Sequence, residues 1–185
     1  MPEAESSICF LFDNGSLEAD STLSLRRIAS WLQVRLRGVE IRPVSLLHSS
    51  AVKAAELGGQ PAELLEPALK AALKGGANSL VLLPLFFGPS AAVTEYVPKR
   101  LRALKKKIPT MCVHVARCLV DERATEDMRI AAILADGVRR AAARAGWKRP
   151  KVALVDHGSP ERAVTAVRDF LGRQLQQLLA GEISA

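Results

Sequence analysis

The sequence predicts an α/β protein built on an open, doubly wound parallel sheet of strand–helix units. Short apolar blocks alternate with longer helical blocks along all 185 residues. One block, SLVLLPLFF at 79–87, is apolar without alternation, as in a central parallel strand covered on both faces. Right-handed crossovers are the usual way to connect repeated units of this kind, and they place the strands in one parallel sheet.

The first strand and helix occupy the N-terminal part of the chain. ICFLF at 8–12 is a short apolar run, as expected of a buried strand. Apolar residues then recur at helical spacing, so we expect a helix with its N-cap at Asp20 or Ser21. Gly38 supplies the stop, because glycine readily adopts the left-handed conformation that ends many helices.

The second strand is VEIRPVSLL at 39–47. Pro43 inside it favours an edge position, because proline has no N–H to donate to a neighbouring strand. The connection after it, residues 48–60, is longer than most strand-to-helix loops and predicts a flap. Pro61 suits the first turn of the next helix, which we expect to stop at Gly75.

Three more strand–helix units complete the chain, and the central strand at 79–87 begins the first of them. A helix is expected over about 95–107, with Pro98 tolerated in its first turn. TMCVHV at 110–115 is the fourth strand, and a long helix over about 125–144 follows it. KVALV at 151–155 is the fifth strand. The last helix carries apolar residues at helical spacing, namely Val164, Val167, Leu171, Leu175 and Leu178.

The charge of the chain favours an anionic partner. The net charge is +7 and the pI is near 9.7, and much of the charge lies in residues 99–107 and 139–151. A solvated helix face is one interpretation of such runs, and a binding patch is the other. We expect no nucleic acid as partner, because no motif with stacking aromatic residues accompanies these runs.

Neither a leader nor a membrane segment is expected. The N-terminus MPEAESS carries acidic residues and no basic region, and the longest apolar run, LVLLPLFF, is too short to cross a bilayer. Cys9, Cys112 and Cys118 are odd in number and lack CxxC spacing, which argues against a disulfide framework and a zinc ribbon. We expect reduced cysteines, in the core where they fall on strands, in a soluble cytoplasmic protein with no membrane partner.

Residues that follow the strands are the candidates for a functional site, because ligands of such sheets bind at the carboxyl ends of the strands. Asn14, His48, Glu95 and His157 are among them. Imidazole and carboxylate groups are good ligands for cobalt, iron, nickel or zinc. For each histidine alone, backbone capping or simple exposure to water is the competing interpretation. His114, inside the fourth strand, is interpreted as an ordinary core or surface histidine.

Two phrases in the chain repeat each other, LFDNGS at 11–16 and LVDHGS at 154–159. In both, glycine suits a tight turn and serine a backbone hydrogen bond or a phosphate at a helix N-terminus. Neither phrase is GxGxxG or a P-loop. The repeat predicts an internal duplication, with one domain over 1–148 and a second, incomplete one over 149–185 that holds one strand and one helix.

The sequence resembles the class II chelatases of the CbiX/SirB type, which act on sirohydrochlorin in cobalamin and sirohaem synthesis. The resemblance is carried by LVDHGSP with its echo LFDNGS, by the block GGANSLVLLPLFFGPSAAVTEYVPKRL, and by the order of strand–helix units between them. It covers nearly the whole chain. It implies a chelatase-like three-layer α/β/α fold, and longer relatives contain two such modules that face each other across a tetrapyrrole cleft.

The resemblance also implies a reaction and its residues. The family's first histidine ligand corresponds to Asn14 in the first phrase and to His157 in the second, and its second histidine falls at about Ala92, while Glu95 is retained. The implied reaction inserts a divalent metal, cobalt or iron, as substrate into an anionic tetrapyrrole, with no organic cofactor. His157, His48 and Glu95 are the predicted catalytic residues and metal ligands, His48 because it follows the second strand.

A second interpretation is a chelatase-like module that does not catalyse and instead binds a tetrapyrrole, a metal or a partner subunit. The loss of histidine at Asn14 and Ala92 supports it. A third, a basic nucleic-acid-binding domain, rests on charge alone. Exchange of the last strand–helix unit between two chains would produce a homodimer.

Overall fold

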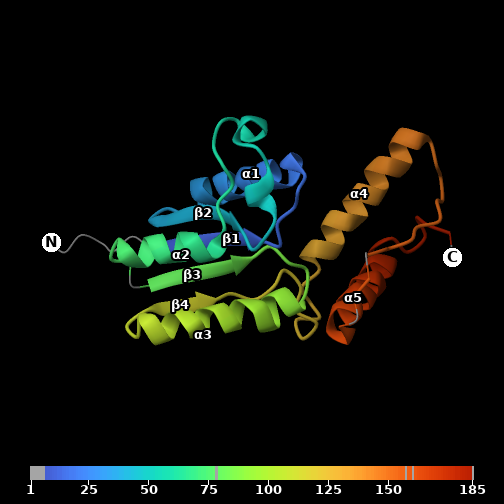
Figure 1. The fold of residues 1–185 in the computed structure, drawn as a ribbon. Coiled ribbons are helices and arrows are strands. Elements are labelled where there is room, and N and C mark those ends of the chain that lie inside the picture. The colour runs from blue at the N-terminus through green and yellow to red at the C-terminus, as the bar shows by residue number, and fades with distance from the viewer. Residues whose placement is uncertain (1–6, 78, 157, 160, 185) are drawn as a thin grey trace. The chain divides into compact units, whose positions relative to one another are not determined.

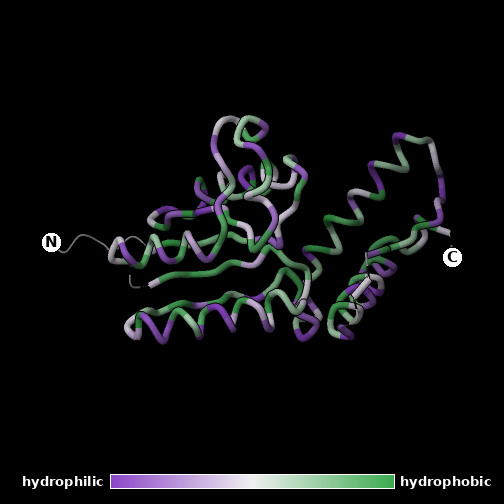
Figure 2. The backbone as a smooth tube through the Cα atoms, viewed as in Figure 1, coloured by the Kyte–Doolittle hydropathy of each residue, from purple (hydrophilic) through white to green (hydrophobic). Residues whose placement is uncertain are grey.

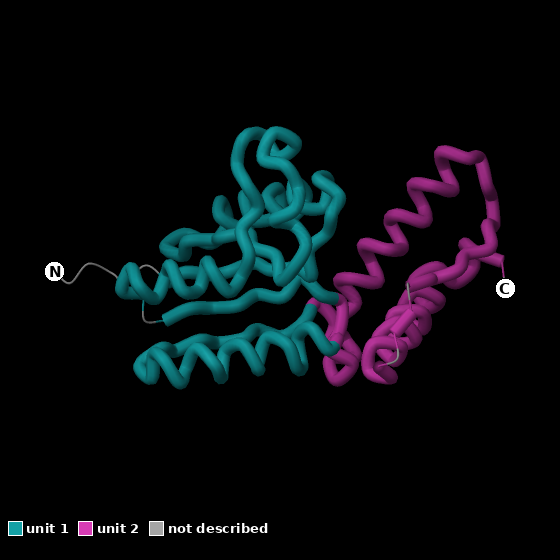
Figure 3. Tube along the Cα trace, in the orientation of Figure 1, with its two compact units in different colours: residues 1–86, 91–118 teal, residues 87–90, 119–185 magenta. Residues whose placement is uncertain are grey.

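The computed structural model of the protein describes residues 7–77, 79–156, 158–159 and 161–184. The chain divides into two compact units, which Figure 3 shows in teal and magenta. The first comprises residues 1–86 and 91–118, and the second comprises residues 87–90 and 119–185. This division follows spatial proximity, whereas the predicted boundary between residues 148 and 149 follows the sequence repeat and stays a prediction.

The first unit is built on a four-stranded parallel sheet in the order β2-β1-β3-β4 (Figure 1). Its strands are β1 (Ser7–Asp13), β2 (Val39–Ser45), β3 (Ser79–Pro84) and β4 (Cys112–Val115). Its helices are α1 (Ala19–Arg35), α2 (Leu65–Lys74) and α3 (Val97–Lys107), with the short turns η1 (Ser49–Ala51), η2 (Ala54–Leu57) and η3 (Ala92–Tyr96). The predicted α/β fold with a parallel sheet is confirmed. β2 is an edge strand, as Pro43 indicated.

Helices cover both faces of this sheet. Phe10 and Phe12 of β1 pack with α2 and α3 on one face, while Cys9 and Leu11 of β1 pack with α1 on the other. Figure 2 shows the strands as largely hydrophobic, and hydrophilic residues along the outer side of α3. A strand buried on both faces needs apolar residues at every position, which explains the unbroken run ICFLF.

Two helix starts in this unit differ from the prediction, and a third, that of the helix predicted over about 125–144, lies at Arg129 in the second unit. α1 begins at Ala19, so neither Asp20 nor Ser21 is its N-cap. α2 begins at Leu65, which leaves Pro61 in the preceding connection. Bonds to distant groups hold the residues before α2: the guanidinium of Arg26 donates to the carbonyls of Leu57, Gln60 and Pro61 at 2.8, 2.8 and 3.0 Å, and the Ser45 N–H donates to the carbonyl of Glu63 at 2.9 Å. These bonds tie the predicted flap and the residues after it to α1 and β2.

The outer strand β4 presents polar groups to solvent. His114 on β4 is exposed, in agreement with its interpretation as an ordinary histidine. All three cysteines are free, and Cys9 is buried in β1 as expected. Cys112, however, is exposed on β4, so the prediction of a core position is wrong for it. An outer strand has a neighbour on one side alone, which leaves more of its surface in water.

The second unit holds two packed helices, α4 (Arg129–Ala145) and α5 (Arg162–Leu178). The predicted strand at 151–155 is wrong, because this segment is not in a strand. Val152 and Leu154 pack against the helical cores instead, and Val155 is 79% exposed. A strand needs a neighbour to satisfy its backbone groups, and all the described strands lie in the first unit.

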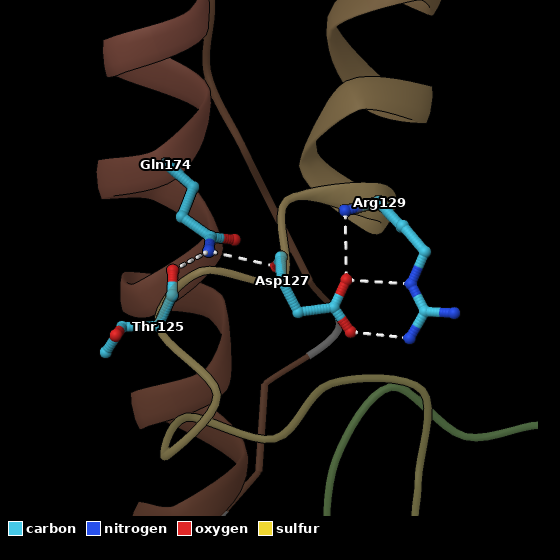
Figure 4. A network of polar contacts seen from close by, with 4 residues as sticks. All are labelled: Thr125, Asp127, Arg129 and Gln174. Carbon is cyan, nitrogen blue, oxygen red and sulfur yellow. Dashed lines mark hydrogen bonds and ion pairs between the residues drawn. The ribbon is translucent and has the colours of Figure 1, made fainter.

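Polar contacts hold the segment before α4 against α5 (Figure 4). The side-chain amide of the buried Gln174 donates hydrogen bonds to the carbonyls of Thr125 and Asp127, at 3.2 and 3.1 Å. The Asp127 carboxylate accepts from the backbone N–H and the guanidinium of Arg129, which lowers the pKa of Asp127 to about 2. These bonds fix the point at which α4 begins. Among the described residues, every helix is too short or too polar to cross a bilayer.

Candidate functional site

The carboxyl edge of the sheet is organised by the ends of β1 and β2. Asp13, the last residue of β1, lies opposite Ser45, the last residue of β2. The pairing continues beyond both strands, because the N–H groups of Leu46 and Leu47 donate to the carbonyls of Asp13 and Asn14 at 2.9 and 3.1 Å. The two loops that leave these strands therefore begin side by side.

Gly15 allows these loops to approach each other. Its φ is +86°, and a Cβ atom added to it would lie 1.7 Å from the carbonyl oxygen of Leu47. No side chain fits in that space. The Gly15 N–H donates to Oδ1 of Asp13 at 3.0 Å, and the N–H of Ser16 donates to Oγ of Ser49 at 3.2 Å. The phrase LFDNGS is thus fixed both to itself and to the loop after β2.

A carboxyl group and two buried hydroxyls lie beneath this corner. Asp13 is hydrogen-bonded to the side chain of Ser45, and the Oγ of Ser49 donates to the Oγ of Ser45 at 3.0 Å. Burial raises the pKa of Asp13, although the bonds from Ser45 and from the Gly15 N–H act in the opposite direction. A carboxyl with a raised pKa at the end of a central strand is a candidate for proton exchange.

His48 is exposed at the centre of a strained turn. Its φ of 64° and ψ of −45°, with a 2.7 Å hydrogen bond from the Ser49 N–H to the Leu47 carbonyl, define the rare γ-turn with positive φ. Such a conformation costs roughly 1–3 kcal/mol in a residue with a side chain. His48 precedes η1 but makes no capping hydrogen bond through its imidazole, so the capping interpretation finds no support.

A hollow of about 330 Å³ opens beside this corner. It is lined by Asn14, Leu46, Leu47, Ala91, Ala92, Glu95, Tyr96 and Lys99. Asn14 and Ala92, the positions that the family resemblance aligns with the family's two histidines, therefore share one hollow with Glu95. Glu95 lies on the π-helical turn η3, and such turns often occur at functional sites. The carboxylate of Glu95 and the ammonium of Lys99 give the hollow groups of both charges.

The structure does not bring the three predicted metal ligands together among the described residues. Glu95 lines the hollow, whereas His48 is not among its lining residues, and His157 lies outside the described residues. Within the ranges that the structure describes, no three His, Cys, Asp or Glu side chains come together as a metal site. The set of His157, His48 and Glu95 stays a prediction.

Sequence reasoning missed the bonded hydroxyls of Ser45 and Ser49, and it missed Lys99. The position of Ser45 at the end of the second strand, and of Ser49 shortly after it, could have indicated the two hydroxyls. The spacing of four residues between Glu95 and Lys99 was the signal for the third, since it places both on one side of a helix.

The corner of the second phrase has the same internal bonds as the first. The N–H of Gly158 donates to Oδ1 of Asp156 at 2.8 Å, as Gly15 does to Asp13 at 3.0 Å. The Ser159 hydroxyl accepts a hydrogen bond from the Glu161 N–H at 3.1 Å, as the Ser16 hydroxyl does from the Glu18 N–H at 3.0 Å. A Cβ added to Gly158 would meet no described atom within 4 Å. This likeness is consistent with the predicted duplication, which stays a prediction.

Solved structures supply the comparison for this geometry, since no protein-family model and no curated protein matches the sequence. SirB from Bacillus subtilis with Fe3+ is 14% identical with a TM-score of 0.67, over 94% of this chain and 61% of that one. The sirohydrochlorin chelatase SirB from Bacillus subtilis subspecies spizizenii, in complex with cobalt, is 11% identical with a TM-score of 0.63, over 96% and 65%. The chain has the SirB fold.

A shorter protein has the same fold. A CbiX protein of cobalamin (vitamin B12) biosynthesis from Marinobacter aquaeolei VT8 is 14% identical with a TM-score of 0.55, over 75% of this chain and 98% of that one. The predicted chelatase-like fold of the CbiX/SirB type is confirmed. The chain spans less than two thirds of the length of either SirB protein.

Replacement of Gly15 by alanine is expected to destabilise the first unit far more than Gly158→Ala destabilises the second. Both changes place a Cβ at positive φ, which costs about 1 kcal/mol. Only the first also drives a Cβ into a backbone carbonyl, so we expect a loss of roughly 3 kcal/mol or more. Urea unfolding measures both, with Trp31 fluorescence for the first unit and Trp147 fluorescence for the second in single-tryptophan backgrounds. Equal losses would contradict the proposed constraint.

Replacement of Asp13 by asparagine is expected to change how stability depends on pH. Because the folded-state pKa of Asp13 is raised, the stability that its carboxyl contributes is fully present below the ordinary pKa of 3.8 and is lost as pH rises through the folded-state pKa. Asparagine keeps an acceptor for the Gly15 N–H but cannot ionise, so Asp13→Asn should gain stability relative to the wild type between pH 4 and pH 7. Urea unfolding across this range measures the gain. The substitution Asp20→Asn, at an exposed position, is the control. An equal pH response in both variants would argue against a raised pKa of Asp13.

Proposed function

We propose that this chain is a chelatase that inserts a divalent metal, cobalt or iron, into sirohydrochlorin, an anionic tetrapyrrole. The observation that carries the proposal is the shared fold with SirB, one structure of which holds Fe3+ and another cobalt. The hollow at the carboxyl edge agrees with it, because it joins Asn14, Ala92 and Glu95 at the part of the fold where open α/β sheets bind ligands.

The reaction requires ligands that release a metal and bases that accept protons. A tetrapyrrole must lose two pyrrole protons as the metal enters the ring. The proposal gives His157 the role of ligand or base, with the exposed imidazole of His48 and the carboxylate of Glu95 as helpers. The ammonium of Lys99, in the same hollow as Glu95, is suited to a carboxylate of the substrate.

A non-catalytic module that binds a tetrapyrrole, a metal or a partner subunit is the second candidate. It is favoured by the side chains of Asn14 and Ala92 in the hollow. A methyl group cannot bind a metal, and a neutral amide is a poor substitute for imidazole towards cobalt or iron. The two candidates share the fold and differ in whether the protein exchanges protons and metal with a tetrapyrrole.

Turnover separates these candidates. The purified chain is incubated with sirohydrochlorin and Co²⁺ or Fe²⁺, and absorbance is followed against the reaction without protein. We expect acceleration, and we expect His157→Ala to reduce the rate about 100-fold, since an imidazole base typically contributes this much. No acceleration by the wild type would reject catalysis and leave the binding module, and an unchanged rate in His157→Ala would reject the role of that residue.

His48 needs a particular variant in the same assay. Because its φ is positive, His48→Gly removes the imidazole while it relieves the strain of the turn, whereas alanine would retain that strain. We expect slower insertion without loss of stability in urea. A normal rate would remove His48 from the proposal.

The hollow can also be tested as a metal site that lacks its imidazoles. Asn14→His combined with Ala92→His places two imidazoles beside Glu95, so we expect Co²⁺ to bind at least tenfold more tightly than to the wild type. Isothermal titration with the metal alone measures this. Addition of Glu95→Gln to the double variant is the control and should reverse part of the gain. Unchanged affinity in the double variant would show that the three positions do not converge on one ion.

A further inference from the structure

The turn after α4 combines an exposed indole with several cations. Residues 146–151, here the Trp147 turn, line a hollow of about 520 Å³ and include Lys148, Arg149 and Lys151. Trp147 is 62% exposed. No acidic residue occurs in the sequence between Asp136 and Asp156. The turn therefore presents a flat aromatic surface in a strongly positive segment.

The backbone of the Trp147 turn is fixed on both sides of the indole. The N–H of Trp147 donates to the carbonyl of Ala142 at 3.0 Å, which closes the end of α4. Ser184 binds the other side, because its N–H donates to the Pro150 carbonyl at 3.0 Å and its hydroxyl donates to the Arg149 carbonyl at 2.8 Å. A fixed backbone lowers the entropy cost of binding.

Glu182, the acidic residue two positions before Ser184, is already paired. Glu182 forms an ion pair with Arg139 at 2.7 Å, and the guanidinium of Arg139 also donates to the second carboxylate oxygen at 2.8 Å. The hydrogen bond and the charge of Arg139 lower the pKa of Glu182, and the carboxylate of Glu182 is thus already paired with a cation outside the turn. The guanidinium of Arg149 donates to the Ile183 carbonyl, a neutral group, so it keeps its full charge at the turn.

We propose that the Trp147 turn binds a planar aromatic ring system that carries several carboxylates. Indole stacks on flat rings, and Lys148, Arg149 and Lys151 pair with carboxylates at the ring edge. The occupant is a single ring system rather than a nucleic acid strand, because Phe170 is the one other aromatic residue in 119–185 and it is buried. Strands of nucleic acid are bound by successive stacking residues. This site shares no lining residue with the hollow at the carboxyl edge, so the proposal adds a second binding site to the proposed function and does not rest on metal insertion.

The chain offers a matched pair of tryptophans for the test. Trp31 on α1 is 65% exposed, close to the 62% of Trp147, but it belongs to the other unit and does not line the hollow at the Trp147 turn. Metal-free uroporphyrin I, whose ring edge carries carboxylates, is titrated into Trp31→Phe and into Trp147→Phe. We expect saturable quenching of Trp147 emission in the first protein, and only the linear inner-filter loss of Trp31 emission in the second. Equal quenching in both proteins would overturn the proposal.

Charge variants test the second half of the site. In the Trp31→Phe background, Lys148→Gln with Lys151→Gln should weaken uroporphyrin binding at least tenfold, whereas Lys106→Gln with Lys107→Gln on α3 should leave it unchanged. Circular dichroism verifies that both double variants are folded. Equal weakening by the two pairs, or quenching by oligothymidine stronger than by uroporphyrin, would overturn the proposal. Because metal is absent throughout, a failure of chelatase activity would not alter either result.

Discussion

The carboxyl edge of the sheet depends on the approach of the Gly15 backbone to the carbonyl of Leu47. A Cβ at this position would lie 1.7 Å from the oxygen, so the two loops can lie side by side only with glycine there. The same carbonyl accepts the hydrogen bond that holds His48 in its strained turn. One close backbone contact thus sets both the position of Asn14 beside the hollow and the exposure of the His48 imidazole.

Much of the fold was predictable because it follows from local sequence and burial. ICFLF and the first part of SLVLLPLFF, up to Pro84, lie in central strands because these runs are almost entirely apolar, and Pro43 lies on an edge strand because it lacks a donor. Predictions failed where a distant group decides the outcome. The residues before α2 are held by bonds from Arg26 and from the Ser45 N–H. KVALV is not in a strand, and the second unit holds no described strand with which it could pair.

The site was predictable to the level of position but not of bonding. The carboxyl ends of the strands and the family resemblance together placed Asn14, Ala92 and Glu95, and these three do line one hollow. The hydroxyl chain beneath Asp13 and the γ-turn at His48 escaped prediction, since both arise from bonds between the loops after β1 and β2. No periodicity within one segment encodes a bond to another segment.

The two Asp-x-Gly-Ser corners show why a repeated phrase does not imply a repeated site. Their shared hydrogen bonds each join residues two positions apart, so the corner forms from its own sequence wherever it occurs. Only the first corner has a neighbouring carbonyl against its glycine. Function therefore has to come from the variable residue and from what lies around it. At Asn14 the surroundings are a formed hollow with an amide in place of imidazole, while His157 lies outside the described residues and the described residues before it, 151–156, are not in a strand.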